Sequence, residues 1–137
     1  MPRTGVTMVT LYEGNIRIEW INPGGGVINP EIWLETPGGP TLLDSSPSTI
    51  TTGHYDAGVY PAGTTVRTSI RDHSSVVIAY SDSLEAQYRD GYVDGLEWVI
   101  DWEDTPGGDY DYNDAYTRVV LTDIVYPTFV PQIIRHH

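Results

Sequence analysis

The sequence predicts an all-β fold, an antiparallel β-sandwich with a jelly-roll-like arrangement of strands. Three observations support this fold class. Apolar and polar residues alternate over many short segments, which is typical of strands that bury one face. The 14 Gly and 10 Pro residues are spread between these segments and mark turns. No segment shows a sustained helical period, and we expect at most one helical turn, at residues 83–88.

The predicted strands follow one another along the chain at short intervals. In residues 15–20, Ile16, Ile18 and Trp20 fall on one face by the two-residue period of a strand. Residues 65–70 are rich in β-branched side chains, which favour strands. The predicted strands comprise residues 6–12, 15–20, 27–34, 65–70, 75–80, 96–102 and 116–122.

Proline and glycine mark the predicted strand ends. The triplet Pro-Gly-Gly occurs at residues 23–25, 37–39 and 106–108. This order is that of a type II turn, because the first glycine must adopt a positive φ. Two further prolines interrupt residues 125–134, where we expect an edge strand.

Length and composition limit the class of protein. A chain of 137 residues fits one domain, and we expect a single domain over residues 1–137. Hydrophobic residues make up 39% of the chain, enough to bury a core, so general disorder is excluded. Cysteine is absent, which excludes disulfide scaffolds, cysteine-ligated zinc, iron–sulfur centres and thiol nucleophiles.

The charge is strongly acidic. Nineteen Asp and Glu residues oppose seven basic residues, all of them Arg, and the formal net charge is −12. Such a chain repels phosphate backbones and anionic lipid, so we expect no nucleic-acid partner and no membrane insertion. No run of 18 apolar residues is present, and the first residues lack the apolar region of a secretory signal. The charge favours binding of cations.

The acidic residues gather in one segment, residues 101–114, where seven of fourteen residues are Asp, Glu or Asn. Asp109, Asp111 and Asn113 are spaced two residues apart, and Asp114 follows directly. Calcium prefers six to eight oxygen ligands, which a tight loop with this spacing can direct to one point. The spacing matches the start of an EF-hand loop, but the glycine and the final glutamate of that motif are missing.

Further ligands are expected from the other arm of the same loop. The Pro-Gly-Gly turn folds the chain back, which can bring Glu103 and Asp104 beside the residues that follow it. The carboxylates then repel one another unless a cation lies among them. We expect calcium rather than magnesium, which retains waters, or zinc, which needs local His or Cys ligands. The alternative is an acidic, solvated hairpin without an ion.

The loop also resembles a known family. Glu103-Asp104, followed by Gly107-Gly108-Asp109-Tyr110-Asp111-Tyr112-Asn113-Asp114, is similar to the signature of the bacterial DUF4114 family. Residues 59–66, 80–82 and 90–94 are similar to its upstream segments, and the resemblance covers about residues 55–122. It implies a calcium-binding β-sandwich of extracellular, cell-surface and adhesin-like proteins, often found beside carbohydrate-binding modules. The metal ligands that it implies are Glu103, Asp104, Asp109, Asp111, Asn113 and Asp114.

The aromatic composition suggests a role for a bound calcium in ligand binding. The chain has 10 Tyr and 4 Trp but one Phe, and Tyr and Trp suit half-exposed binding surfaces. A calcium with open coordination beside an exposed Tyr110 could bind sugar hydroxyls, whereas Tyr112 and Trp102 are expected to pack inward. Trp98 should share the face of Trp102. Asp82, Glu85, Asp90 and Asp94 form a second acidic loop, which is either merely solvated or adds ligands. Its ligand-binding candidates are Asp82, Asp90 and Asp94.

Catalysis has little support in the sequence. Paired carboxylates can hydrolyse glycosides, but those of the acidic loop are crowded rather than separated across a cleft. We expect His54 and His73 to be loop residues, and no G-x-S-x-G motif is present. We therefore predict a calcium-dependent, lectin-like carbohydrate-binding protein that is not an enzyme. The alternative is a structural or adhesive module in which calcium only stabilises the fold. Multivalent binding of glycans favours a homo-oligomer, such as a homodimer.

Overall fold

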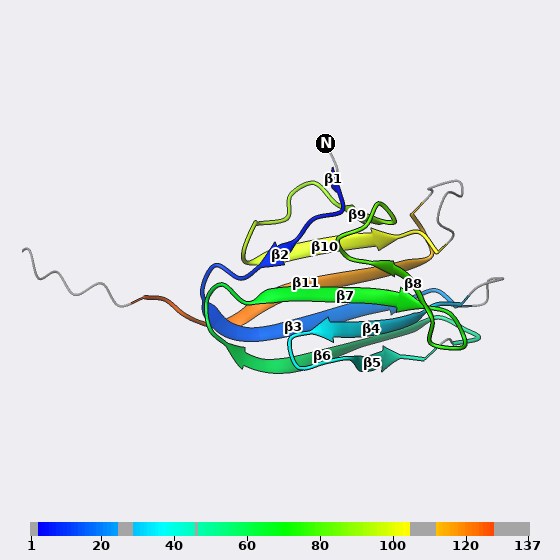
Figure 1. Ribbon diagram of the computed structural model, residues 1–137, viewed down its shortest axis with the longest axis horizontal. Helices are drawn as coiled ribbons and strands as arrows, with labels where there is room; N and C mark the ends of the chain where they lie inside the picture. The colour runs from blue at the N-terminus through cyan, green and yellow to red at the C-terminus, as the bar shows by residue number, and fades with distance from the viewer. Residues whose placement is uncertain (1–2, 25–28, 46, 105–111, 128–137) are drawn as a thin grey trace, which may run out of the picture.

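The structure is a computed structural model that describes residues 3–24, 29–45, 47–104 and 112–127. In this part of the chain it contains eleven strands and no helix, arranged as two antiparallel sheets (Figure 1). The predicted all-β, antiparallel β-sandwich is therefore confirmed. The described residues include no helix of the length and apolarity that crossing a bilayer requires.

The larger sheet has six strands in the order β1-β9-β10-β11-β3-β6, and each neighbouring pair is antiparallel. Its longest strands, β3, β6 and β11, lie side by side along the molecule (Figure 1). In sheet order the strands are β1 (Arg3–Thr4), β9 (Ala86–Tyr88), β10 (Glu97–Trp102), β11 (Ala115–Val125), β3 (Glu13–Asn22) and β6 (Thr51–Tyr60).

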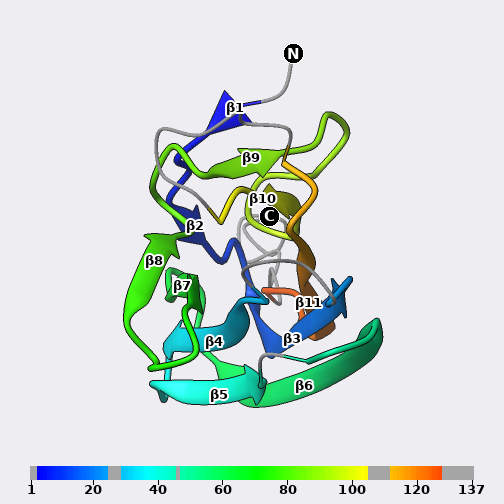
Figure 2. The same ribbon diagram turned by 90° about the vertical axis from the view of Figure 1, so that its right-hand side faces the viewer.

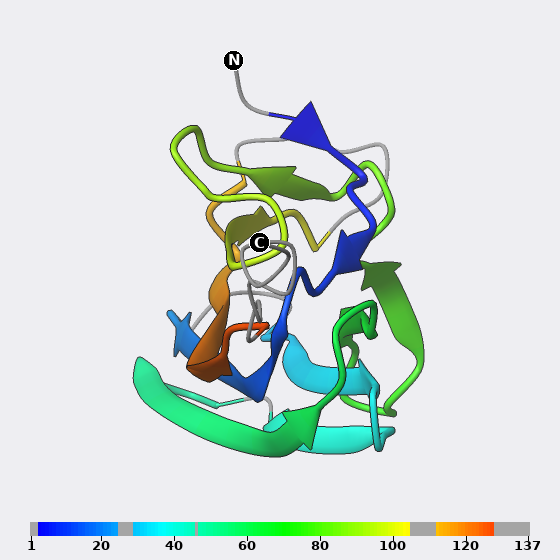
Figure 3. The ribbon, with the colours of Figure 1, turned by 90° about the vertical axis from the view of Figure 1, so that its left-hand side faces the viewer.

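The smaller sheet has five strands, centred on β7. Strands β2 and β8 both pair with β7, which also pairs with β4, and β4 pairs with β5. The strands are β2 (Met8–Val9), β4 (Glu31–Thr36), β5 (Thr41–Asp44), β7 (Thr65–Arg71) and β8 (Val77–Tyr80). Views along the strands from the two ends show the sheets facing each other, with β5 beside β6 at one edge (Figures 2 and 3).

The core fills the space between the two sheets. Alternation along the strands decides which side chains enter it: on β11, positions 115, 117, 119 and 121 are buried, and the residues between them are half-buried. The largest fully buried side chains are Trp98, Trp102, Tyr88, Met8, Ile16, Ile18, Ile32, Leu34, Ile70, Ile100, Val66 and Val119.

Most of the predicted strands are present. The segments 15–20, 65–70, 75–80, 96–102 and 116–122 correspond to β3, β7, β8, β10 and β11. The segment 6–12 contains only the two-residue β2, and the strand expected at 27–34 begins at Glu31. Strand β11 ends at Val125, and most of the predicted edge strand at 125–134 lies outside the described residues.

Two predictions of local structure were wrong, and three strands were missed: β1, β5 and β6. Residues 86–88 of the expected helical turn form β9, in which Ala86 and Tyr88 are buried with the period of a strand. His54 lies in β6, not in a loop. Strand β6 escaped prediction because its sequence is polar and contains two glycines. As an edge strand it needs no clear apolar alternation, because most of its residues are exposed or half-buried.

Candidate functional site

Three carboxylates of the acidic loop converge at the ends of two paired strands. Glu103 and Asp104 follow β10 directly, Asp114 precedes β11, and Trp102 pairs with Ala115 across the two strands. One potential ligand oxygen from each of the three acidic residues lies within 4.8 Å of the others. Antiparallel pairing of β10 with β11 accounts for this arrangement, because it brings Glu103 and Asp104 close to Asp114.

Backbone hydrogen bonds hold this cluster in place. The N–H of Asp104 donates to Oδ2 of Asp114 at 3.0 Å, and the N–H of Asp114 donates to the carbonyl oxygen of Trp102 at 3.1 Å. The N–H of Glu103 donates to the carbonyl oxygen of Glu85 at 2.8 Å. Both ends of the loop are thus fixed before any ligand binds.

Burial makes this cluster costly without a counter-charge. Glu103 is 2% exposed and Asp104 9% exposed, while Asp114 is half-buried. Carboxylates this close together repel one another, and a buried charge is costly unless it is paired. A donor set made only of oxygens fits calcium, and bidentate binding by three carboxylates can supply most of its ligands. Asn113 is exposed beside the cluster. Asp109, Asp111 and Tyr110 lie outside the described residues.

Aromatic side chains flank the described ends of the loop along the chain. Trp102 is fully buried, and its Nε1–H donates to Oγ1 of Thr117 at 2.9 Å. Trp98 is buried on the same face, so both expectations for these tryptophans are confirmed. Tyr112 is half-buried, and its hydroxyl donates to the carbonyl oxygen of Leu84 at 3.1 Å.

Asp82, Asp90 and Asp94 of the second predicted loop do not belong to this cluster. Asp82, Asp90 and Asp94 are all exposed. Asp82 forms an ion pair with Arg67 at 3.1 Å, and Asp94 forms one with Arg3 at 3.2 Å. Within the described part of the chain, the acidic group suited to a metal contains none of these three residues. Their role in ligand binding stays a prediction.

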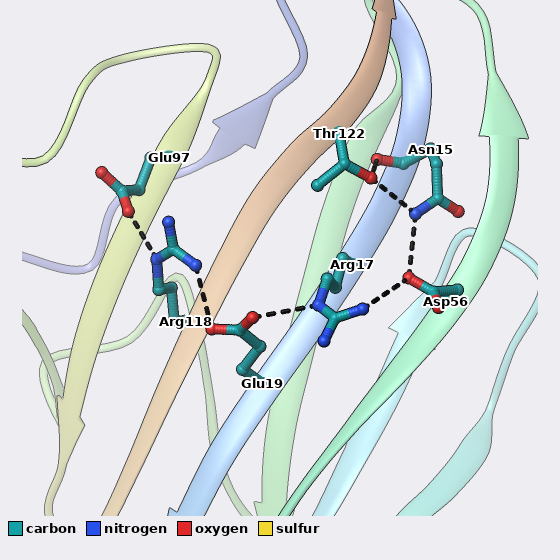
Figure 4. Close-up of polar contacts among 7 residues, drawn as sticks. All are labelled: Asn15, Arg17, Glu19, Asp56, Glu97, Arg118 and Thr122. Atoms are coloured by element: carbon teal, nitrogen blue, oxygen red, sulfur yellow. Dashed lines mark hydrogen bonds and ion pairs between the residues drawn. The ribbon is translucent and has the colours of Figure 1, made fainter.

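A second polar feature, which the sequence analysis missed, covers the outer face of the six-stranded sheet (Figure 4). Glu19 of β3 accepts hydrogen bonds from Nε of Arg17 and from Nη1 of Arg118, both at 2.9 Å. Arg118 also donates to Glu97 of β10, and Arg17 lies 3.6 Å from Asp56 of β6. One chain of alternating charges therefore crosses four neighbouring strands.

The network favours the charged forms of Glu19 and Arg118. Burial disfavours ionisation of Glu19, but the hydrogen bonds and charges of Arg118 and Arg17 outweigh it and hold the pKa of Glu19 below its ordinary value. Burial likewise opposes the charge of Arg118, but Glu19 and Glu97 outweigh it and raise the pKa of Arg118. A signal for this network was present in the sequence, because the residues facing away from the core on β3 include Arg17 and Glu19.

Comparison with known proteins gives one structural similarity and no family. No protein-family model matches the chain, and no curated protein matches it. Among solved structures, the chain is similar to the C-terminal domain of the BC2L-C lectin from Burkholderia cenocepacia, at 17% sequence identity. The match covers 94% of this chain and 100% of that domain, with a TM-score of 0.40.

Proposed function

We propose that this protein is a calcium-dependent, lectin-like carbohydrate-binding protein whose calcium is held by the acidic loop between β10 and β11. The observation that carries the calcium site is the convergence of Glu103, Asp104 and Asp114, with two of the three buried. The resemblance of residues 103–114 to the DUF4114 signature adds support. The remaining ligands are Asn113 and, outside the described residues, Asp109 and Asp111.

The carbohydrate part of the proposal follows from the chemistry of such a loop. When bound, calcium supplies positive charge that cancels the carboxylate repulsion, and open coordination positions that sugar hydroxyls can fill. Tyr110 would then stack against a sugar ring, and Asp82, Asp90 and Asp94 would accept hydrogen bonds from hydroxyls. The protein acts by recognition and not by catalysis, because the clustered carboxylates hold a cation rather than flank a scissile bond.

A second candidate function is a structural or adhesive module without a sugar ligand. The hydrogen bond from the Asp104 N–H to Asp114 favours it, because that bond already ties together the two ends of the loop. A cation at the same place would strengthen this closure and stabilise the pairing of β10 with β11 at the loop end. In this case calcium would change stability alone.

Thermal unfolding with calcium, with magnesium and with a chelator tests the metal site. A cation that binds only the native state at about 100 times its Kd raises the free energy of unfolding by about 2.7 kcal/mol. We expect calcium to raise Tm, magnesium to have a smaller effect, and Asp111→Ala to abolish the calcium response. Glu13→Gln, at an exposed acidic residue of β3, is the control and should respond like the unchanged protein. An unchanged Tm in calcium would refute the site.

A glycan array probed in calcium and in chelator then separates the two functions. Glycan binding supports the lectin, and a protein that is stabilised by calcium but binds no glycan is the structural module. The proposed homodimer is measured independently by sedimentation equilibrium with and without calcium. A monomer under both conditions would remove the multivalency argument.

A further inference from the structure

We propose that the outer face of the six-stranded sheet is a groove that binds a neutral oligosaccharide, at a site separate from the acidic loop. The inference rests on the proposed function for its ligand class, carbohydrate, and assigns that ligand to different residues. The charge network centred on Glu19 and Arg118, drawn in Figure 4, includes lining residues of this groove.

Two adjoining hollows form the groove. One has a volume of about 600 Å³ and the other about 650 Å³, and both are lined by Arg17, Glu19 and Arg118. The first extends to Ile21 and Tyr116, whereas the second extends in the opposite direction to Thr122. Because the two hollows share three lining residues, they form a single continuous surface.

The groove runs along the strands and is long. From position 116 to position 122 of β11 the chain advances six residues, which at 3.3–3.4 Å per residue is about 20 Å. A surface of this length suits an extended oligomer of several rings better than a single sugar. The first hollow also includes Arg89, whose guanidinium lies 2.9 Å from Asp101, so paired charges continue across the sheet to β9 and β10.

Aromatic and apolar surface is available at one end of the groove. Tyr116 is half-buried and lines the first hollow together with Ile21, which is 45% exposed. Such surfaces stack against the C–H faces of sugar rings.

The charges of the groove favour a neutral, hydroxyl-rich ligand. Each guanidinium faces carboxylates on two sides: Arg118 lies between Glu19 and Glu97, and Arg17 lies between Glu19 and Asp56. A hydroxyl can accept from an arginine and donate to a neighbouring carboxylate at once, which neither a simple anion nor a cation can do. The net charge of −12 disfavours anionic glycans in addition.

The network is also pre-organised. Ion pairs fix the rotamers of Arg17, Glu19 and Arg118 before a ligand arrives, so binding loses less side-chain entropy. The three carboxylates of the calcium cluster line neither hollow. Binding in the groove should therefore persist when calcium is removed.

Calorimetric titration with defined oligosaccharides tests the groove. The probes are cellohexaose, xylohexaose, mannohexaose, laminarihexaose and maltohexaose, with a galacturonic acid oligomer as the anionic comparison. We expect at least one neutral probe to bind in chelator and the anionic oligomer not to bind. Arg118→Gln and Tyr116→Ala should each weaken binding about tenfold or more, through loss of charge-assisted hydrogen bonds and of stacking respectively.

Two further variants keep the outcome interpretable. Arg71→Gln removes an equally well paired arginine, 2.7 Å from Glu35 on the smaller sheet, and should leave binding unchanged. His54→Ala changes an exposed residue that lines the first hollow, so it serves if Arg118→Gln fails to fold. Circular dichroism of each variant confirms that its fold is retained before titration.

The possible results separate this inference from the proposed function. Binding that survives chelator and weakens in the groove variants supports the groove. Binding that is lost in chelator but unaffected by the groove variants overturns it and leaves the calcium-dependent lectin in place. No binding of any neutral probe overturns the groove. The glycan array then decides independently whether the protein recognises carbohydrate.

Discussion

Asp114 accepts a hydrogen bond from the backbone N–H of Asp104 at 3.0 Å, which joins the two ends of the acidic loop. The same two side chains belong to the cluster of three carboxylates. One oxygen of Asp114 therefore has a structural role, because it accepts the Asp104 N–H. The negative charge of Asp114 is repelled by the carboxylates of Glu103 and Asp104. These two properties can be separated by substitution.

The first prediction compares Asp114→Asn with Asp114→Ala. The asparagine keeps an oxygen for the Asp104 N–H but loses the charge, so in chelator its Tm should equal or exceed that of the unchanged protein. The alanine leaves a buried N–H without its acceptor, which costs about 1–3 kcal/mol. Both variants should lose most of the stabilisation by calcium. An asparagine variant less stable in chelator than the alanine variant would contradict this account.

The second prediction concerns the contact between Gly95 and Leu11. Gly95 has a φ of +85°, and a Cβ there would lie 2.6 Å from Cβ of Leu11, whose N–H donates to the Gly95 carbonyl oxygen. Gly95→Ala should cost about 2–4 kcal/mol, from a left-handed backbone and an overpacked contact.

Gly91 provides the matched control for this prediction. Its φ is +92°, but a Cβ there would meet no atom within 4 Å. Gly91→Ala should therefore cost only the backbone component, about 1–2 kcal/mol. Urea denaturation measures both variants, and equal losses would show that the contact with Leu11 contributes nothing.

The sequence predicted best those strands whose residues alternate strongly. β3 and β10 were found because one face of each enters the core and the other does not. β6 was not found, because an edge strand with most residues exposed or half-buried lacks that contrast. Residues 83–88 were mistaken for a helical turn because only three of them form a strand, too short for a period to be distinguished.

The two candidate sites also differed in how well the sequence predicts them. The acidic loop could be found because the proposed ligands lie within fourteen consecutive residues, and local pairing brings Glu103, Asp104 and Asp114 together. The groove could not be found, because its residues come from separate strands. The order of β10, β11, β3 and β6 in the sheet places Glu97, Arg118, Glu19 and Asp56 in one row, and strand order is not visible in the sequence.

The third prediction tests the support of the acidic loop. Trp102 donates its Nε1–H to the buried hydroxyl of Thr117, and Trp102→Phe removes this donor. The loss should cost about 1–3 kcal/mol, with a further cost for the smaller ring. Trp33→Phe is the comparison. The Nε1–H of Trp33 donates to Glu31 at 2.9 Å, and this hydrogen bond is only partly buried, so its loss should cost less than that of the Trp102 bond. Thermal unfolding in chelator measures both.

The fourth prediction concerns alkaline stability. Tyr88 is fully buried, and its hydroxyl lies 2.8 Å from the carbonyl oxygen of Ser81 and 3.0 Å from that of Val6. Burial raises the pKa of Tyr88 above its ordinary value of 10.0, so its stabilisation is present below pH 10 and is lost as pH rises further. Tyr88→Phe should cost about 1 kcal/mol of stability at neutral pH. Above pH 10 the variant should lose less stability than the unchanged protein, because the titrating hydroxyl is gone. Urea denaturation at a series of pH values measures both effects.

The fifth prediction concerns the stability of the protein at acidic pH and links it to ligand binding in the groove. The pKa of Glu19 lies below its ordinary value of 4.5 in the folded protein. Its stabilisation is therefore fully present above pH 4.5 and is lost as pH falls through the folded pKa. Glu19→Gln removes this dependence and leaves Arg17 and Arg118 without a shared carboxylate. The variant should be less stable at neutral pH, and its deficit should shrink in acid.

Glu13→Gln separates this effect from general loss of negative charge. Glu13 lies on the same strand but is exposed, and its substitution should change stability little at any pH. Oligosaccharide binding in the groove should weaken over the same acid range in which the stability contribution of Glu19 is lost, because protonation removes the negative charge that Arg17 and Arg118 share. Binding that stays constant while the Glu19-dependent stability disappears would mean that the network supports the sheet but does not contact the ligand.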